Sequence, residues 1–190
     1  MRFQWLGGLL ILYVLFQFLK KKSNPIQSSL NPRNVSGGSF LYDKVFQLVG
    51  REEGFNPVAV RDGTDRNGNP LYTIGFGHQI QPNERELMTK RITEIEAKVI
   101  YDTDIQKIVS DMESNIKVSI NENQFLALIS LRYNIGGPQF NSSTLLRKLN
   151  ANDYTGAADE FAKWRLSDGR INNVLVARRA REKSLFLNPV

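Results

Sequence analysis

The chain has 190 residues, enough for one domain of ordinary size and an additional segment. It contains no cysteine, which excludes disulfide frameworks, cysteine-ligated metals and thiol chemistry. The formal net charge is +6, and Arg2 with Lys20, Lys21 and Lys22 supplies four of these charges, leaving +2 for residues 23–190. The basic character therefore belongs to the N-terminal segment, and the rest of the chain lacks the charge of a nucleic-acid-binding domain.

Residues 3–19 carry no charge and are mostly apolar. As a helix they would span about 25 Å, slightly less than the ~30 Å hydrocarbon core of a bilayer, and the lysines at 20–22 could snorkel to make up the difference. We expect residues 1–22 to form an uncleaved, single-pass transmembrane helix. A cleaved signal peptide is the second interpretation, although no small-residue cleavage site follows. A core helix is the third, and the absence of a polar face disfavours it.

Residues 23–39 are rich in Ser, Asn, Pro and Gly, a composition typical of a flexible tether. The folded domain is expected over residues 40–190. Its first helix has apolar residues at helical spacing and should end at Glu53, because Gly54 follows.

A β-hairpin is expected next, with strands over residues 56–61 and 71–76. The loop over residues 63–69 has a superficial likeness to a calcium-binding loop. If Gly68 is placed at the invariant glycine, a glycine falls at the first ligand position and an isoleucine at the final glutamate position. The calcium pattern fails, so the loop is interpreted as a solvated hairpin turn.

Capping signals predict the remaining helices. Thr93 and Glu96 form a capping box that opens a long helix reaching about residue 116. Residues 121–124 are a second N-terminal signature, and Gly136 should end that helix. Shorter helices are expected over about 143–150, 154–164 and 175–186. The pattern as a whole predicts a mostly helical domain with one small hairpin.

Two carboxylates, Glu53 and Asp62, flank the first strand, and Thr73 begins a segment that closes at the only histidine, His78. Glycoside hydrolysis uses one carboxylic acid to protonate the leaving oxygen and a second carboxylate to handle water or the sugar carbon. The chain has 19 acidic residues, so this spacing alone would not separate a catalytic pair from surface carboxylates. The order of the whole set is the stronger signal.

This ordered set, Glu53-Gly54, Asp62 and Thr73-Ile74-Gly75-Phe76-Gly77-His78, resembles the phage-type lysozymes (endolysins) of glycoside hydrolase family 24. The resemblance covers roughly residues 41–187. It continues through Gln124–Ser130, Tyr133–Gly136, Ser143–Asn150 and Ala177–Glu182. It implies an α+β, lysozyme-like fold, mainly helical, with the glycan in a cleft between a small β-hairpin lobe and a helical lobe.

The resemblance also implies the catalytic residues. Glu53 would be the general acid and Asp62 the second carboxylate, with the Thr73 hydroxyl helping to orient water for attack with inversion. The loop between Asp62 and Thr73 is longer than is usual in the family, which leaves Asp65 as an alternative to Asp62. On the residues alone, Glu53 could be a surface acid, Asp62 a turn residue and Thr73 an ordinary strand residue.

The resemblance implies a structural role for His78, through pairing of its imidazole with a carboxylate. One histidine cannot form a metal site without several carboxylates, so no metal or organic cofactor is expected. Several basic residues are expected either to flank a cleft for an acidic polymer or to form a solvated helix face. They are Arg147, Arg178, Arg179, Arg181 and Lys183.

The implied function is that of a muramidase, which hydrolyses the β-1,4 bond between N-acetylmuramic acid and N-acetylglucosamine in peptidoglycan for cell-wall lysis by a bacteriophage. The expected partners are glycan strands and, through residues 3–19, a membrane; no nucleic acid is expected, and the domain should be monomeric. A lytic transglycosylase is one alternative, but it can work with a single glutamate, so Asp62 and Thr73 favour hydrolysis. A membrane-tethered, non-catalytic wall-binding or virion protein is another, and it would not need this set.

The sequence leaves the membrane topology open. Acting on host peptidoglycan requires the domain outside the inner membrane, whereas the lysines at 20–22 outweigh Arg2 and favour the opposite orientation. The domain is therefore expected either in the periplasm, as a signal-anchor endolysin, or beside the internal membrane of a virion.

Overall fold

The structure, a computed structural model, describes residues 38–50, 53–65, 67–167 and 169–188. The chain divides into two units, residues 1–34 and 35–190, and every described residue belongs to the second. The predicted anchor and most of the predicted tether lie outside the described residues. Within the ranges given, no helix is both long enough and apolar enough to cross a membrane.

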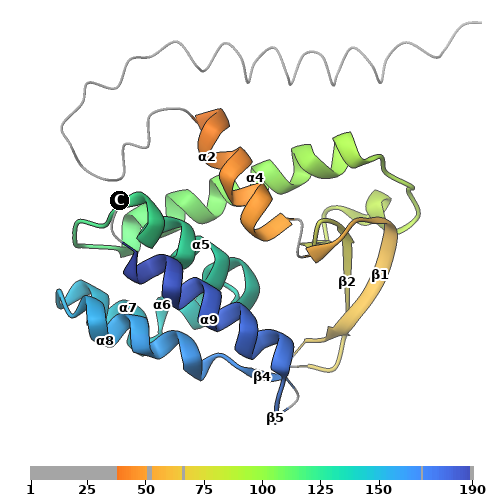
Figure 1. Ribbon diagram of the computed structural model, residues 1–190. Coiled ribbons are helices and arrows are strands. Elements are labelled where there is room, and N and C mark those ends of the chain that lie inside the picture. The colour runs from red at the N-terminus through yellow and green to blue at the C-terminus, as the bar shows by residue number, and fades with distance from the viewer. Residues whose placement is uncertain (1–37, 51–52, 66, 168, 189–190) are drawn as a thin grey trace, which may run out of the picture. The chain divides into compact units, whose positions relative to one another are not determined.

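The domain has a β lobe and a group of helices, connected by the long helix α4 (Figure 1). The β lobe is an antiparallel sheet in the order β1 (Asn56–Thr64), β2 (Pro70–Gly75), β3 (His78–Gln79). The helix α4 (Glu94–Asn115) starts beside this sheet, packs against β2 and runs unbroken for 22 residues into the helical lobe. It therefore contributes side chains to both lobes.

The central helix of the helical lobe is α5 (Glu122–Ile135), in which every residue from Phe125 to Leu131 is buried. It packs chiefly against α9 (Asn173–Leu187), while α7 (Thr144–Asn150) packs against α8 (Tyr154–Glu160). The remaining elements are α2 (Gly38–Val45), the π-helix η2 (Phe46–Gly50), the 3₁₀ helices η3 (Arg85–Met88) and η4 (Phe161–Lys163), α6 (Gly137–Asn141), and the ribbon of β4 (Leu166–Ser167) with β5 (Arg170–Ile171).

The predicted capping box at Thr93 is present, and the second predicted N-terminal signature is also a capping box. The Thr93 hydroxyl accepts from the backbone N–H of Glu96, and the Glu96 carboxylate accepts from that of Thr93 at 2.8 Å. Asn121 and Gln124 exchange the equivalent hydrogen bonds at the start of α5. Local side-chain chemistry therefore sets the beginnings of the two helices that organise the domain.

A cluster of aromatic rings joins the first helical segment to the rest of the domain. Phe46 meets Phe76 and Tyr101 edge-on, with ring centroids 4.8 Å and 5.4 Å apart, and Tyr101 lies 5.4 Å from Tyr133. These residues come from η2, the loop after β2, α4 and α5. The cluster therefore fixes the chain on both sides of Glu53.

The first helix differs from the prediction in type, because the chain widens into a π-helix after Val45. A Cβ placed on Gly50 would lie 2.4 Å from a ring carbon of Phe46, so this turn requires glycine. Single turns of π-helix inside α-helices frequently occur near functional sites. No periodicity argument predicts such a turn, because it depends on how the Phe46 ring packs.

Candidate active site

Glu53 has helical backbone geometry, and Gly54 after it has φ of 72°, a left-handed conformation that glycine adopts without strain. Helical geometry is therefore present at the residue where the sequence predicted the first helix to end. The Glu53 side chain is 24% exposed. Its carboxylate therefore has protein on one side and access to solvent on the other.

Arg178 of α9 is bound to this carboxylate. Its Nη1 donates to Oε1 of Glu53 at 2.8 Å, and its side chain is only 9% exposed. A pair so largely removed from solvent is screened little by salt. Sequence analysis missed the pairing, because the two residues are distant in the chain and Arg178 differs from its basic neighbours only in its packing.

The segment after β2 passes directly beside Glu53. A Cβ placed on Gly77, whose φ is 85°, would lie 3.7 Å from Cβ and Cγ of Glu53 and 3.6 Å from the Tyr133 hydroxyl oxygen. That hydroxyl donates to the Phe76 carbonyl at 2.7 Å. Burial, followed by the charges of Asp104 and Glu53, raises the pKa of Tyr133, so the hydroxyl keeps its proton. The fold thus brings the Glu53-Gly54 pair and the Thr73–His78 segment together.

Asp62 and Thr73 lie on the two paired strands of the hairpin. Val60 on β1 is paired with Thr73 on β2, and Asp62 follows Val60 by two residues on β1. The pairing register shifts between Arg61 and Thr64, so alternation along β1 does not fix the face on which Asp62 lies. Asp62 is exposed and Thr73 is partly buried, which leaves the carboxylate accessible to a ligand.

Asp65 organises the turn of the hairpin. Its Oδ1 accepts from the backbone N–H groups of Asn67 and Asn69, each at 2.8 Å, and its Oδ2 accepts from the Asn69 amide at 2.9 Å. Hydrogen bonds from the Asn69 side chain and then its backbone lower the pKa of Asp65. Both oxygens of the Asp65 carboxylate already accept hydrogen bonds from the turn, which favours Asp62 over Asp65 as the second carboxylate of the site.

His78 is buried between two carboxylates, as its predicted structural role requires. Its Nδ1 lies 2.6 Å from Oδ2 of Asp104 and its Nε2 lies 2.9 Å from Oε2 of Glu84. Burial lowers the pKa of His78, but the hydrogen bonds and charges of Asp104 and Glu84 outweigh burial and raise it overall. Across the described ranges, no group of three or more His, Asp or Glu side chains is arranged to hold a metal ion.

A cavity of about 420 Å³ lies next to the segment that contacts Glu53. Its walls include Gly77, His78, Gln79, Lys107 and Tyr133. Gly77 borders both this cavity and the Glu53 side chain, but Glu53 itself is not among the residues that line the cavity. The lining offers the amide and hydroxyl groups that hydrogen-bond sugars.

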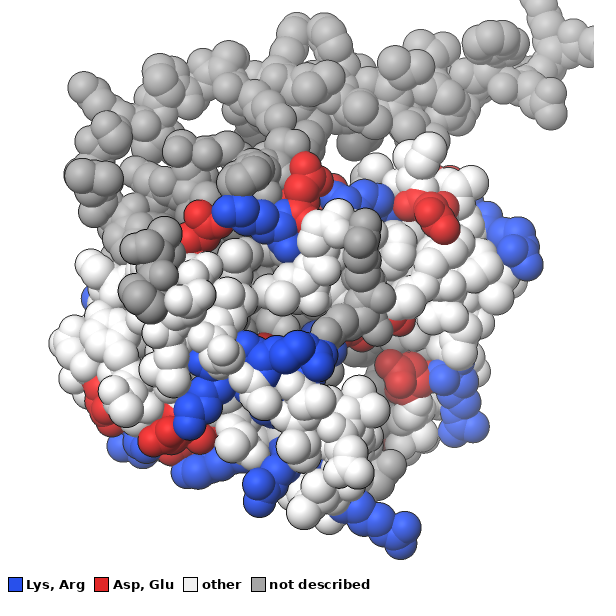
Figure 2. All heavy atoms as spheres, in the orientation of Figure 1, with Lys and Arg blue, Asp and Glu red and all other residues white. Residues whose placement is uncertain are grey.

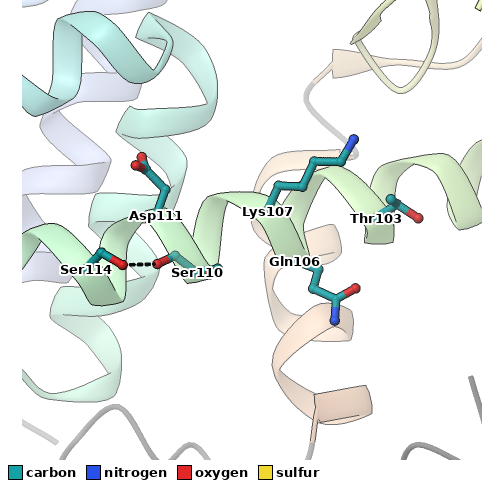
Figure 3. Close-up of a pocket in the computed structure, with 6 residues that line it drawn as sticks. All are labelled: Thr103, Gln106, Lys107, Ser110, Asp111 and Ser114. Atoms are coloured by element: carbon teal, nitrogen blue, oxygen red, sulfur yellow. Dashed lines mark hydrogen bonds between the residues drawn. The ribbon is translucent and has the colours of Figure 1, made fainter.

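A larger hollow of about 620 Å³ runs along α4 (Figure 3). Its lining residues are Thr103, Gln106, Lys107, Ser110, Asp111 and Ser114, and the Ser114 hydroxyl donates to the Ser110 carbonyl at 3.0 Å. Glu53, Asp62 and Thr73 are not among these lining residues, so the volume of a hollow does not by itself identify the candidate active site. Lys107 belongs to both hollows, which makes them neighbours along α4.

Five basic residues were expected either to flank a cleft for an acidic polymer or to form a solvated helix face. Arg178 and Arg179 do neither, because they are only 7% and 1% exposed and pair with Glu182. They are part of the interior rather than a solvated face or a polymer-binding surface. Arg147 and Arg181 are exposed, in agreement with either expectation. Figure 2 shows Lys and Arg side chains spread over the face that carries α9 and the β4–β5 ribbon.

Comparison with known proteins assigns the family. A family model described as phage lysozyme matches residues 50–182. The chain belongs to the phage lysozyme family. The matched region contains all of the candidate site residues described above, namely Glu53, Asp62, Thr73 and Arg178.

Among its relatives, an endolysin of Acyrthosiphon pisum secondary endosymbiont phage 1 is 35% identical over 152 residues, covering 77% of this chain and 97% of the relative. An endolysin of Bacillus phage B103 is 40% identical over 119 residues, 61% of this chain, and the match spans only 43% of that protein's length. A SAR-endolysin of bacteriophage PS119 is 32% identical over 155 residues, 80% of this chain and 89% of the relative.

Solved structures confirm the lysozyme-like fold expected from the resemblance. The muramidase domain of SpmX from Asticaccaulis excentricus superposes with a TM-score of 0.64 at 31% identity, covering 77% of this chain and 96% of that domain. The fold is mostly helical with small sheets, as predicted.

Proposed function

We propose that this phage lysozyme is a muramidase that hydrolyses the β-1,4 bond between N-acetylmuramic acid and N-acetylglucosamine in peptidoglycan. The observation that carries the proposal is the partly exposed Glu53 carboxyl, bound by Arg178 and bordered by Gly77 next to an open cavity. Family membership and the muramidase domain among the structural neighbours support the same substrate.

In the proposed reaction Glu53 gives its proton to the glycosidic oxygen while the bond from that oxygen to the sugar carbon breaks. Water attacks the same carbon from the opposite face and loses a proton to Asp62, and the Thr73 hydroxyl holds the water in line. The carboxylate left on Glu53 is stabilised by Arg178, whose Nη1 is 2.8 Å from Oε1. Attack by water from the opposite face inverts the sugar carbon.

Inversion requires room for water between the two carboxyl groups. We expect Glu53 and Asp62 to be separated by roughly 6.5–9.5 Å when substrate is bound, rather than the ~5 Å of retaining enzymes. The position of Asp62 and Thr73 on the paired strands of one hairpin supports these roles. No metal or organic cofactor takes part in the proposed mechanism.

Product analysis tests this proposal. Purified peptidoglycan is digested with the full chain, and the fragments are separated and weighed by mass spectrometry. A muramidase leaves reducing N-acetylmuramic acid ends. Anhydro ends would establish a lytic transglycosylase, and intact strands would establish a binding protein. Glu53→Gln is the negative control, because it removes the proton donor while keeping the side-chain shape.

We also propose that residues 1–22 form a membrane anchor and that residues 23–39 tether it to the catalytic domain, which acts as a monomer. The apolar, uncharged run over residues 3–19 supports the anchor. The SAR-endolysin of bacteriophage PS119, which matches over most of this chain, is consistent with membrane association. The orientation of the anchor is treated below as a prediction with its own test.

A further inference from the structure

Arg178 is held on its other side by a second carboxylate, Glu182, which is 3% exposed. Its Oε1 accepts hydrogen bonds from the Ser130 hydroxyl at 2.6 Å, from Nη2 of Arg179 at 2.9 Å and from Nε of Arg178 at 3.4 Å. Its Oε2 lies 2.8 Å from Nε of Arg179, an ion pair outside hydrogen-bond geometry. All these partners are donors, so the site requires carboxylate oxygens.

The guanidinium of Arg178 therefore bridges two carboxylates. Its Nε faces Glu182 and its Nη1 faces Glu53 at 2.8 Å. A guanidinium is planar and its N–H groups have fixed directions, so holding one edge fixes the direction of the others. The geometry of the group that touches Glu53 thus depends on a residue that does not touch it.

We propose that Glu182 is a positioning residue for the reaction: it orients Arg178 against Glu53, and its negative charge offsets part of the positive charge that Arg178 and Arg179 present to Glu53. The inference rests on the proposed role of Glu53 as proton donor. Glu182 itself does not contact the substrate in this arrangement, because it is buried behind the arginines.

The charged and titratable groups around the Glu53 and Glu182 carboxyls determine how Glu53 should respond when the charge of Glu182 is removed. In the described part of the chain, Glu53 is influenced by Arg178, by Tyr101 of α4 and by Tyr133 of α5. Burial raises the pKa of both tyrosines, so neither adds charge. Glu182 is an acidic partner of Arg178, and removing its charge would increase the net positive charge that acts on Glu53.

The test compares the full chain with Glu182→Gln, in detergent, on purified peptidoglycan. Gln keeps the shape but loses the charge and turns an amide N–H₂ toward donors. We expect the alkaline limb of the pH profile of kcat to move down by about one pH unit, because the Glu53 carboxylate is then favoured.

A matched control is available in Glu160, which is 4% exposed and lies 2.7 Å from each of two lysine ammonium groups. Glu160→Gln removes an equally buried, doubly paired carboxylate on α8, and it should lower the melting temperature without moving the limb. If the alkaline limb of the kcat profile lies at the same pH in Glu182→Gln and in wild type, Glu182 has only a structural role and the inference is overturned.

Glu182→Asp is a second variant that keeps the charge and shortens the side chain by one methylene. Because the charge is kept, the alkaline limb should move by less than half of the shift seen in Glu182→Gln. Because the shorter side chain no longer holds Arg178 in place, kcat should fall roughly tenfold at unchanged KM. A wild-type kcat in this variant would contradict the inference, even if Glu182→Gln fails to fold. Failure of the proposed function would look different, since wild type itself would then leave peptidoglycan uncut.

Discussion

Nη1 of Arg178 lies 2.8 Å from Oε1 of Glu53, across a sequence separation of 125 residues. This contact joins the last helix of the domain to the end of its first helical segment. It gives the proposed proton donor a fixed position at the boundary between protein and solvent. The proposed proton donor is therefore in direct contact with the C-terminal helix, and we expect changes in α9 to alter the environment of Glu53.

We predict that Glu53→Gln lowers peptidoglycan cleavage by roughly 10²–10⁴-fold, the usual contribution of a general acid. The amide oxygen of Gln can still accept from Arg178, so the domain should stay folded. Turbidity loss of purified walls measures the activity, and far-UV circular dichroism with thermal melting measures the fold. Retention of more than a few per cent of wild-type cleavage by a folded variant would remove Glu53 from this role.

We predict that Asp62→Asn is far more damaging to activity than Asp65→Asn. Asp62 is an exposed residue of the strand that pairs with the strand of Thr73, whereas Asp65 is occupied by the hydrogen bonds of the turn. Asp65→Asn should instead lower the melting temperature slightly. Initial rates and melting curves of both variants separate the effects, and a larger activity loss at Asp65 would reverse the assignment.

The sequence predicted several local features of the fold around the candidate site, because rules that act over a few residues determine them. A glycine after Glu53, a hairpin turn and two capping boxes are signals that act over a few residues, and each appears in the structure. The long-range parts were not predictable in this way. The pairing of Arg178 with Glu53 and the burial of Arg179 depend on how α9 packs, and a basic helix looks the same in sequence whether its arginines are solvated or buried.

The elements missed by sequence analysis are short. β3 has two residues, and the β4–β5 ribbon has two in each strand. Alternation over so few positions carries no pattern, and such strands form only because a neighbour is already in place. The π-helix at Phe46–Gly50 is a further case, since its cause is the packing of one ring.

The turn at Gly50 gives a prediction about stability. Gly50→Ala should destabilise the domain by about 1–3 kcal/mol, because the added methyl would meet the Phe46 ring at 2.4 Å and that ring packs between Phe76 and Tyr101. Urea denaturation measures the change. Gln47→Ala, at an exposed position of the same π-helix, is the matched control and should be nearly neutral. A neutral Gly50→Ala would mean that the ring relaxes freely.

The pairing of His78 gives a prediction about pH. The pKa of His78 is raised in the folded protein, so its contribution to stability is complete below about pH 6.5, the unfolded value, and declines as pH rises through the folded value. His78→Asn should therefore cost roughly 2–3 kcal/mol at pH 6 and about half of that at pH 9. Urea denaturation of both proteins at the two pH values measures the difference. A constant cost would show that the charged form of His78 contributes nothing.

The same variant separates a structural role from a catalytic one. His78 bonds to Asp104 and Glu84 through its two ring nitrogens, which leaves no ring nitrogen for a substrate. The turnover of folded His78→Asn should thus stay within about tenfold of wild type, with both limbs of the pH–rate profile retained. The loss of one limb would make His78 a catalytic group.

The final prediction concerns the orientation of the proposed anchor, for which the requirements of function and charge conflict. Cleaving host peptidoglycan from the inner membrane requires the domain in the periplasm, with the lysines at 20–22 exported. The positive-inside tendency favours the reverse, because three lysines outweigh Arg2 and the amino terminus. We predict export, because an endolysin that acts at lysis has no substrate in the cytoplasm.

Protease treatment of intact spheroplasts that express the full chain decides between the orientations. Digestion of the domain from outside supports export, and a cytoplasmic marker protein must survive as the control for intact membranes. Replacing Lys20, Lys21 and Lys22 by glutamine should increase the exported fraction if the charges retard translocation. Complete protection of the domain until lysis would contradict export. It would favour instead a lysozyme that faces the cytoplasm, is captured with membrane inside an assembling virion, and cuts the wall at entry.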